Sequence, residues 1–253
     1  LTTTGYAPDF SYPTGSMLVE REGFRTLAVR YVNVDTVLVT TAPVPDSLEA
    51  RILATPEWSL AQNWALLAPG ATTRTVALTG ARDVPLVSAV RVPTYNAARS
   101  GSPTLTAVRI APLHDDTTRT RRRGIALVQV TDLGIAARLG AEEAVVWVTT
   151  VHDGLAAAGA SVVLYDRAGG VRAQGTTDAQ GLVRLSGFAP DTAANDRTRR
   201  FGGGFEGYVA ATLGNDRAVV SLDSYAWELE PWRFNVAAAA PGQRIPAAAA
   251  VFT

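Results

Sequence analysis

The chain has 253 residues, of which 47% are hydrophobic and 18% charged, and its formal net charge is zero. This length suits one large domain or two ordinary ones, and the composition is that of a folded protein. Zero net charge gives no overall attraction to nucleic acid or to an anionic membrane. The absence of cysteine excludes disulfides, thiolate metal sites and cysteine nucleophiles.

The sequence carries no sign of a membrane span or of a signal peptide. No run approaches the ~18 apolar residues that a membrane-spanning helix needs. The chain begins with leucine rather than methionine, so we expect a fragment of a longer protein. The first residues therefore say nothing about localisation.

The first part of the chain is predicted to be an entry segment followed by a β-sandwich. Residues 1–13 contain Thr, Gly and Pro without periodicity and form the predicted entry segment. Short apolar runs bounded by turns predict a sandwich domain over residues 14–113. Leu27, Val29 and Tyr31 alternate with polar or smaller residues and share the predicted inward face. The predicted strands cover residues 17–20, 24–32, 36–42, 72–78, 84–92 and 104–110.

One short helix is predicted inside this first domain, in the stretch DSLEARILA. Its apolar residues Leu48, Ile52 and Leu53 are spaced to lie on one helical face. Asp46 or Ser47 is the expected N-cap, because short polar side chains accept hydrogen bonds from the first backbone N–H groups.

A polar stretch separates the two halves of the chain. Residues 114–123 contain no apolar residue and carry both charges, so we predict that they are the linker between two domains. A second sandwich is predicted over residues 124–236. Residues 237–253 are expected to lead to a further module.

The second domain is predicted from apolar runs that alternate with glycine-containing turns. Glycine supplies the positive φ that tight turns require, and residues 177–181 should need it at Gly181 or close by. The last two strands form a predicted hairpin that closes a seven-strand sandwich. The predicted strands cover residues 126–130, 144–148, 160–165, 171–175, 182–185, 208–213 and 217–222.

Three segments carry a resemblance to a known family. The sequences VQVTDLGIAARL, VVWVTTV and GASVVLYDRAGGVRAQGTTDAQGLVRL, all within residues 124–185, resemble a macroglobulin-like domain of bacterial alpha-2-macroglobulins. In that family such domains precede a module with a Y-R-P-G sequence. The turn-rich part of the pattern is shared with carboxypeptidase-regulatory-like and other surface sandwich modules.

The resemblance implies a function that composition alone does not. Bacterial alpha-2-macroglobulins are broad-spectrum protease inhibitors of the periplasm, thought to work beside cell-wall synthesis enzymes. A protease cuts a bait region, the multidomain chain rearranges, and a Cys-Gln thioester captures the protease. This chain has no cysteine, so the resemblance implies a scaffold for a bait region and a thioester located elsewhere. Target proteases and neighbouring domains are the implied partners, and a lipid anchor upstream is one implied means of attachment.

The polar residues show no pattern typical of catalysis or metal binding. His152 and Asp153 would need a serine on a strained turn to form a triad, and the sequence has no G-x-S-x-G motif. Adjacent acids, at residues 115–116 and 142–143, point apart on an extended chain and do not form an acid–base pair. No close set of His, Cys or carboxylate ligands suggests zinc. We therefore predict no catalytic residue, no metal and no cofactor.

Two basic runs and five tryptophans leave binding alternatives to consider. The runs at residues 119–123 and 197–205 are interpreted as exposed loops, although the second resembles Arg/Gly/Phe RNA-binding segments. Trp147 lies in an apolar strand and is predicted to be in the core. Trp58, Trp64 and Trp227 are predicted either to contact another domain or to pack locally.

The resulting prediction is an all-β protein with two tandem immunoglobulin- or fibronectin-III-like, macroglobulin-like β-sandwich domains and a short helix in the first. Its predicted role is a non-catalytic part of a bacterial alpha-2-macroglobulin-like inhibitor, with no contact to nucleic acid or membrane. The alternative is a surface-adhesion sandwich, or one that binds carbohydrate or protein.

Overall fold

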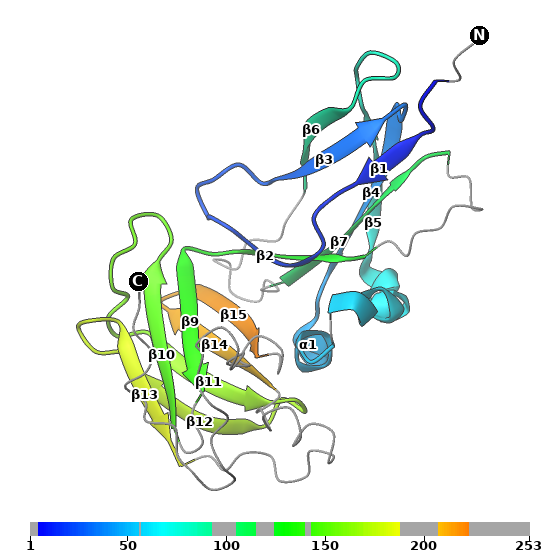
Figure 1. Cartoon of the computed structure of the whole chain (residues 1–253). Helices are drawn as coiled ribbons and strands as arrows, with labels where there is room; N and C mark the ends of the chain where they lie inside the picture. Colours follow the sequence, from blue (N-terminus) through cyan, green and yellow to red (C-terminus); the bar gives the residue numbers. More distant parts are fainter. Residues whose placement is uncertain are drawn as a thin grey trace, which may run out of the picture.

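A computed structural model gives the structure of the chain as two β-sandwiches, as the sequence predicts (Figure 1). Each sandwich consists of two packed sheets. Among the described residues, no helix is long and apolar enough to cross a membrane. The structure describes residues 5–55, 57–92, 105–114, 124–139, 143–187 and 207–222.

The first sandwich packs a three-stranded sheet against a five-stranded one. Leu27, Val29 and Tyr31 are buried between the sheets, which confirms the predicted inward face. The three-stranded sheet consists, in spatial order, of β1 (Asp9–Ser11), β3 (Thr26–Val32) and β6 (Leu86–Arg91). The five-stranded sheet consists of β2 (Gly15–Val19), β8 (Ala126–Val130), β7 (Leu105–Pro112), β4 (Thr36–Pro43) and β5 (Thr72–Ala77).

A helical segment connects β4 to β5. Its first helix lies where the sequence predicts it, but its N-cap is Pro45, with φ −64° and ψ 149° and no side-chain cap. The predicted caps Asp46 and Ser47 are wrong, because the fixed φ of proline already suits a helix start and Asp46 then lies in the first turn. The segment comprises α1 (Asp46–Leu53), the 3-10 helix η1 (Glu57–Asn63), α2 (Trp64–Leu67) and the 3-10 helix η2 (Ala68–Gly70).

The second sandwich packs three strands against four, although one of these seven, β9, is not among the predicted strands, and the predicted strand 126–130 lies in the first sandwich. Its closing hairpin, β14 and β15, is confirmed and turns at Gly214 and Asn215. One sheet consists of β13 (Leu182–Ser186), β10 (Glu143–Thr150) and β9 (Leu133–Leu139). The other consists of β12 (Val171–Thr176), β11 (Ser161–Asp166), β14 (Gly207–Leu213) and β15 (Asp216–Leu222).

Two strands lie where the sequence predicts none. β9 does alternate, with Leu133 and Ala137 in the core, but its outward residues include glycine and alanine and therefore give little polar contrast. β1 lies within the predicted entry segment and pairs with β3. Its three residues are too few to show a period.

Strand β8 belongs to the first sandwich, whereas the sequence assigns it to the second. It pairs with β7 antiparallel and with β2 parallel. All five of its residues are buried, so no polar face indicates which sheet it joins. The chain therefore passes from one sandwich to the other between Val130 and Leu133. We infer a boundary there, in place of the predicted linker at 114–123.

Trp147 is not in the core. It is 49% exposed on the outer side of β10, while its neighbours Val146 and Val148 are fully buried. Because successive side chains of a strand point to opposite faces, an apolar run conceals which residues face outward. The indole N–H of Trp147 donates to the backbone oxygen of Gln180 at 3.2 Å, and Leu182 lies opposite on β13.

We predict that Gly181→Ala strongly destabilises the fold. Gly181 has the expected positive φ, +75°, and a Cβ there would lie 2.4 Å from the backbone oxygen of Val148. The φ strain and the backbone clash together should lower the free energy of unfolding, measured with urea, by about 2–4 kcal/mol. Gly154→Ala is the matched control, because Gly154 has φ +71° with nothing within 4 Å, and it should lose only about 1 kcal/mol. Equal losses would contradict the close approach.

Candidate functional site

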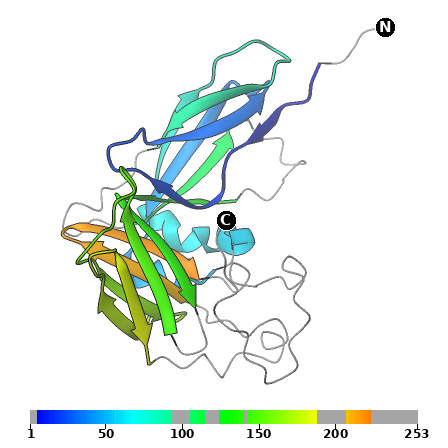
Figure 2. The same ribbon diagram turned by 60° about the vertical axis from the view of Figure 1, so that its left-hand side comes forward.

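The two sandwiches share a buried apolar junction. It joins β4, α1, β7 and β8 of the first sandwich to β14 and β15 of the second, and α1 lies against this hairpin (Figures 1 and 2). β14 is buried on both faces, with Val209 and Ala211 in its own core and Tyr208 and Ala210 in the junction. The junction core consists of Ala42, Val44, Ile52, Leu53, Leu60, Leu67, Leu105, Ala107, Ile125, Leu127, Tyr208, Ala210 and Val219.

A side-chain amide connects the two sandwiches at this junction. Gln129 on β8 donates from Nε2 to the backbone oxygen of Val219 at 2.8 Å and accepts from its backbone N–H at Oε1 at 2.9 Å. Both residues are buried. β15 is the last strand of its sheet, so Gln129 satisfies backbone groups of an edge that no strand pairs.

A two-pronged ion pair lies beside the amide. Arg217 on β15 donates from Nη1 and Nη2 to Glu49 on α1, at 2.7 and 2.5 Å. Burial acts to lower the pKa of Arg217, but the hydrogen bonds and charge of Glu49 outweigh it and raise the pKa overall. Glu49 is only 6% exposed, so the two hydrogen bonds from Arg217 offset the cost of burying its carboxylate.

Two tyrosines of the second sandwich complete this part of the junction. The rings of Tyr165 and Tyr208 stack at 4.6 Å with an interplanar angle of 11°. Burial, and then the charge of Glu49, raises the pKa of Tyr208 to about 12. Its hydroxyl therefore stays protonated at physiological pH, and the junction gains no second negative charge beside Glu49.

The short connection between β8 and β9 is held by polar contacts. Asp216 Oδ2 accepts a hydrogen bond from the backbone N–H of Asp132 at 2.8 Å. The same oxygen lies 2.5 Å from Arg21 Nη2, and this contact is ionic because its geometry is not that of a hydrogen bond. Thr131, fully buried, accepts from the N–H of Leu133. These contacts fix the connection on both sides.

Two further contacts cross the junction at its ends. Ser221 Oγ donates to the backbone oxygen of Leu53 at 2.6 Å, which holds β15 to the end of α1. His152 Nδ1 lies 2.9 Å from Glu20 Oε1. The hydrogen bond and charge of Glu20 raise the pKa of this exposed histidine, so it is a surface contact between the sandwiches.

Among the residues that the structure describes, the polar residues considered above are engaged in local contacts. Asp153 accepts a hydrogen bond from Thr150, and its pKa is lowered mainly by that bond. Glu143 pairs with Arg184 across β10 and β13. Within the described residues, no group of three or more His, Cys, Asp or Glu could hold a metal ion.

The tryptophans and basic runs divide between described and undescribed residues. Trp64 is partly buried and packs against the junction core, which contains residues of both sandwiches. The other residues considered above lie outside the described residues. They are the side chains of Trp58 and Trp227, Glu142, which precedes Glu143 in the second acidic pair, and residues 115–116, 119–123 and 197–205. The junction residues Gln129 and Arg217 were missed, because a lone polar residue in an apolar strand does not reveal its partner.

We predict that Gln129→Leu lowers the free energy of unfolding by about 2–4 kcal/mol. Leucine fills a similar space but leaves the buried N–H and C=O of Val219 without partners. Gln174→Leu on β12 is the control, because Gln174 is exposed and its replacement should change stability by less than about 0.5 kcal/mol. Urea denaturation of both variants tests this, and equal losses would show that the amide bridge contributes little.

We predict a strong coupling between Arg217 and Glu49 in a double-mutant cycle to alanine. The coupling free energy should be about 2 kcal/mol, because the pair is two-pronged and Glu49 is buried. The control is Arg184 and Glu143, 3.3 Å apart with side chains 72% and 52% exposed, whose coupling should stay below about 0.5 kcal/mol. A coupling for the junction pair no larger than the control's would refute the assignment.

Comparison with known proteins gives a family model and several solved structures. Residues 130–241 match the model described as the bacterial alpha-2-macroglobulin MG3 domain. The structure of native alpha-2-macroglobulin from Escherichia coli spanning domains NIE-MG1 is similar over 85% of this chain and 97% of that chain, with 18% identity and a TM-score of 0.59. The structure spanning domains MG0-NIE-MG1 from the same organism is similar over 88% of this chain and 66% of that chain, with 18% identity and a TM-score of 0.55.

One similar structure is of a much longer chain. Trypsin-activated alpha-2-macroglobulin from Escherichia coli is similar with 17% identity and a TM-score of 0.57, over 85% of this chain but only 14% of that one. At these identities the solved structures show the fold alone. No curated protein matches the chain. The family match begins at Val130, where β8 ends, and residues 130–241 thus belong to the bacterial alpha-2-macroglobulin family, as the resemblance predicted.

Proposed function

We propose that the chain is a non-catalytic structural part of a bacterial alpha-2-macroglobulin-like protease inhibitor. The observation that carries this proposal is the buried junction, in which Gln129, Arg217 and Glu49 tie the two sandwiches together. A unit held in this way keeps its two ends at a constant distance and angle. Such a unit suits a scaffold that positions a bait region and a thioester located elsewhere in a longer polypeptide.

The similar proteins support the choice of inhibitor class. One similar structure is of an alpha-2-macroglobulin activated by trypsin, and another is of the Salmonella protein reacted with methylamine. Reaction with a protease and with an amine nucleophile fits a protein with a cleavable segment and an activated acyl group. This chain, which lacks cysteine, would contribute neither the thioester nor the trapping chemistry.

The remaining expectations about context follow from the same family. We place the parent polypeptide in the periplasm or cell envelope, where its neighbouring domains, target proteases and cell-wall synthesis enzymes would be its partners. The carbohydrate-binding alternative requires an exposed strip of aromatic side chains that includes Trp58 and Trp64. Trp64 is partly buried, and the side chain of Trp58 lies outside the described residues. Exposed Trp147 lies on the opposite side of the second sandwich, so these two tryptophans do not share a platform.

The test compares this chain with the longer polypeptide that contains it. Each is mixed with trypsin, and the digestion of casein is followed. We expect the longer polypeptide to slow digestion, and the 253-residue chain alone to leave it unchanged and to hydrolyse nothing itself. The Gln129→Leu variant of the longer polypeptide should inhibit less than the Gln174→Leu variant, because only the first loosens the junction.

Two outcomes would contradict the proposal. Casein digestion at the full rate in the presence of the longer polypeptide would remove the inhibitor function. Inhibition by the isolated chain would remove the scaffold role, because the chain would then carry the inhibitory element itself.

A further inference from the structure

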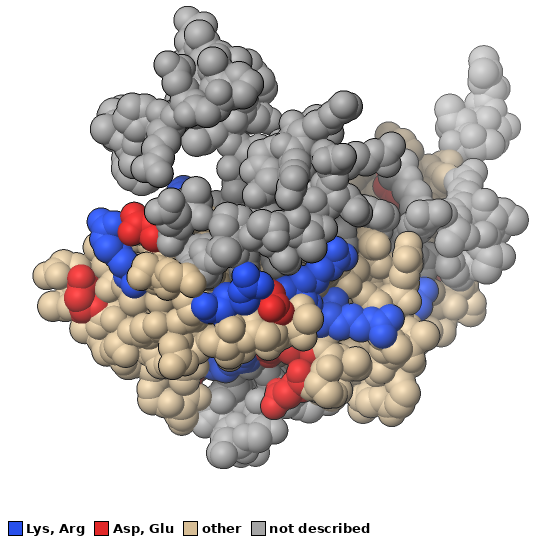
Figure 3. All heavy atoms as spheres, turned by 90° about the horizontal axis from the view of Figure 1, so that it is seen from below, with Lys and Arg blue, Asp and Glu red and all other residues tan. Residues whose placement is uncertain are grey.

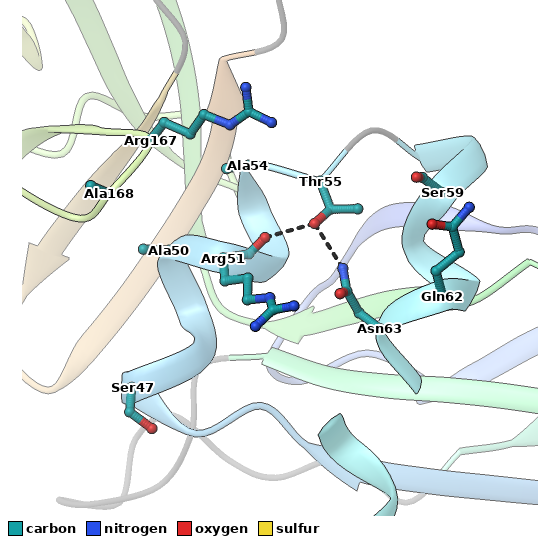
Figure 4. Close-up of a pocket in the computed structure, with 10 residues that line it drawn as sticks. All are labelled: Ser47, Ala50, Arg51, Ala54, Thr55, Ser59, Gln62, Asn63, Arg167 and Ala168. Carbon is teal, nitrogen blue, oxygen red and sulfur yellow. Dashed lines mark hydrogen bonds between the residues drawn. The ribbon is translucent and has the colours of Figure 1, made fainter. Parts of the chain in front are cut away.

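Two grooves lie beside the junction of the sandwiches, and they differ in character. The larger has a volume of about 470 Å³ and lies between α1 and the β11–β12 turn. Polar side chains of its wall already bind one another, because Asn63 donates to Thr55 Oγ1, which donates in turn to the backbone oxygen of Arg51 (Figure 4). Seen from below, acidic side chains lie beside several arginines of the described surface, so charge does not single out a site on this face (Figure 3).

The smaller groove has a volume of about 210 Å³ and lies beside β2, β9 and β15. Most of the described residues that line it are apolar. Leu18 on β2 is 39% exposed, and Ile135 on β9 and Val220 on β15 are only partly buried. Gln129 and Val219, the partners in the amide bridge, also line this groove, so it continues the junction towards the surface.

The smaller groove runs along an open side of the second sandwich. β9 is the last strand of one sheet and β15 is the last strand of the other, and these two strands contact each other. Among the described residues, no strand pairs with β9 or β15 on this side. Apolar side chains along such an edge stay in contact with water until another segment covers them. An extended apolar segment would therefore be stabilised in this groove.

Residues 227–230 have the pattern that such a groove favours, because they read Trp-Glu-Leu-Glu. In an extended segment, successive side chains point to opposite faces. The tryptophan and the leucine then share one face, and the two glutamates share the other. The apolar face can pack into the groove while both carboxylates remain in water. Pro231 ends the pattern, because it has no N–H with which to pair.

This segment reaches the groove directly from β15. That strand ends at Leu222, and Val220, two residues earlier, already lines the groove. Residues 223–253 lie outside the described residues. The four residues 223–226 span at most about 13 Å and are enough for the chain to reverse direction. The family match also continues past Leu222 to residue 241, so the family model groups the segment with the strands of the second sandwich.

We propose that residues 227–230 dock in the smaller groove, with Trp227 and Leu229 facing into it. The docked segment contacts both sandwiches, because Leu18 belongs to the first and Ile135 to the second. Burial of a tryptophan removes a large apolar area from water, and this favours docking. The segment thus reinforces the junction and fixes the place from which the chain leaves the second sandwich.

The segment of the same chain is a better occupant than a second copy of the protein. A tether of four residues holds the segment beside its own groove at a high effective concentration. Nine described residues line the groove, whereas a stable interface between two proteins takes about 20–30 residues from each side.

The experiment attaches a nitroxide to the segment of the 253-residue chain and follows backbone amide signals by NMR. The chain has no cysteine, so Glu228→Cys gives a single attachment site, on the face that points to water. The amides of residues 17–18 and 133–135 should lose most of their intensity, because they line the groove although they are distant in sequence. The amides of β6, far from the second sandwich, should keep theirs and report that the chain is folded (Figure 1).

Two tryptophan variants of the labelled chain separate docking from mere proximity. Trp227→Ala removes the side chain that anchors the segment, so the intensity at residues 17–18 and 133–135 should return. Trp232→Ala is the matched control, because Trp232 lies beyond Pro231, and it should leave the intensity loss unchanged.

Three results would overturn the proposal. The first is full intensity at residues 17–18 and 133–135 in the labelled chain, and the second is an intensity loss that Trp227→Ala leaves unchanged. The third is an equal loss in an isotope-enriched chain without the nitroxide that is mixed with the labelled one, because the segment would then occupy a second copy. The trypsin experiment above does not depend on this groove, so either proposal can fail alone.

Discussion

The arrangement of this protein depends on how one exposed strand edge is satisfied. β15 ends its sheet, and an edge strand leaves backbone groups without partners. Gln129 meets the N–H and C=O of Val219 with a single amide, in the way that another strand would. Because the amide comes from the neighbouring sandwich, satisfying this edge also fixes one sandwich against the other.

The same junction explains why β14 is apolar on both sides. One face of it fills the core of its own sandwich, and the other packs against β8 and α1. The buried Glu49 is compatible with this environment because Arg217 gives it two hydrogen bonds. Apolar contact alone would allow many docking geometries. The hydrogen bonds of Gln129 and of Arg217 can form in only one of them, and they therefore specify how the two sandwiches dock.

A rigid pair of sandwiches suits the inhibitor proposed above, in which the longer polypeptide would rearrange as a whole. If the junction stays intact, movement takes place at other boundaries. The exposed face around Trp147 lies away from this junction.

The sequence by itself determined the all-β class, the short helix and most strands, because alternation and glycine turns are local patterns. It also placed Gly181 correctly, since its positive φ is a property of one turn. Only the tertiary structure decided that β8 joins the first sandwich, that Trp147 faces outward and that Gln129 bridges the two halves. These depend on which distant strand lies alongside, and a strand buried on both faces carries no local sign of its partner.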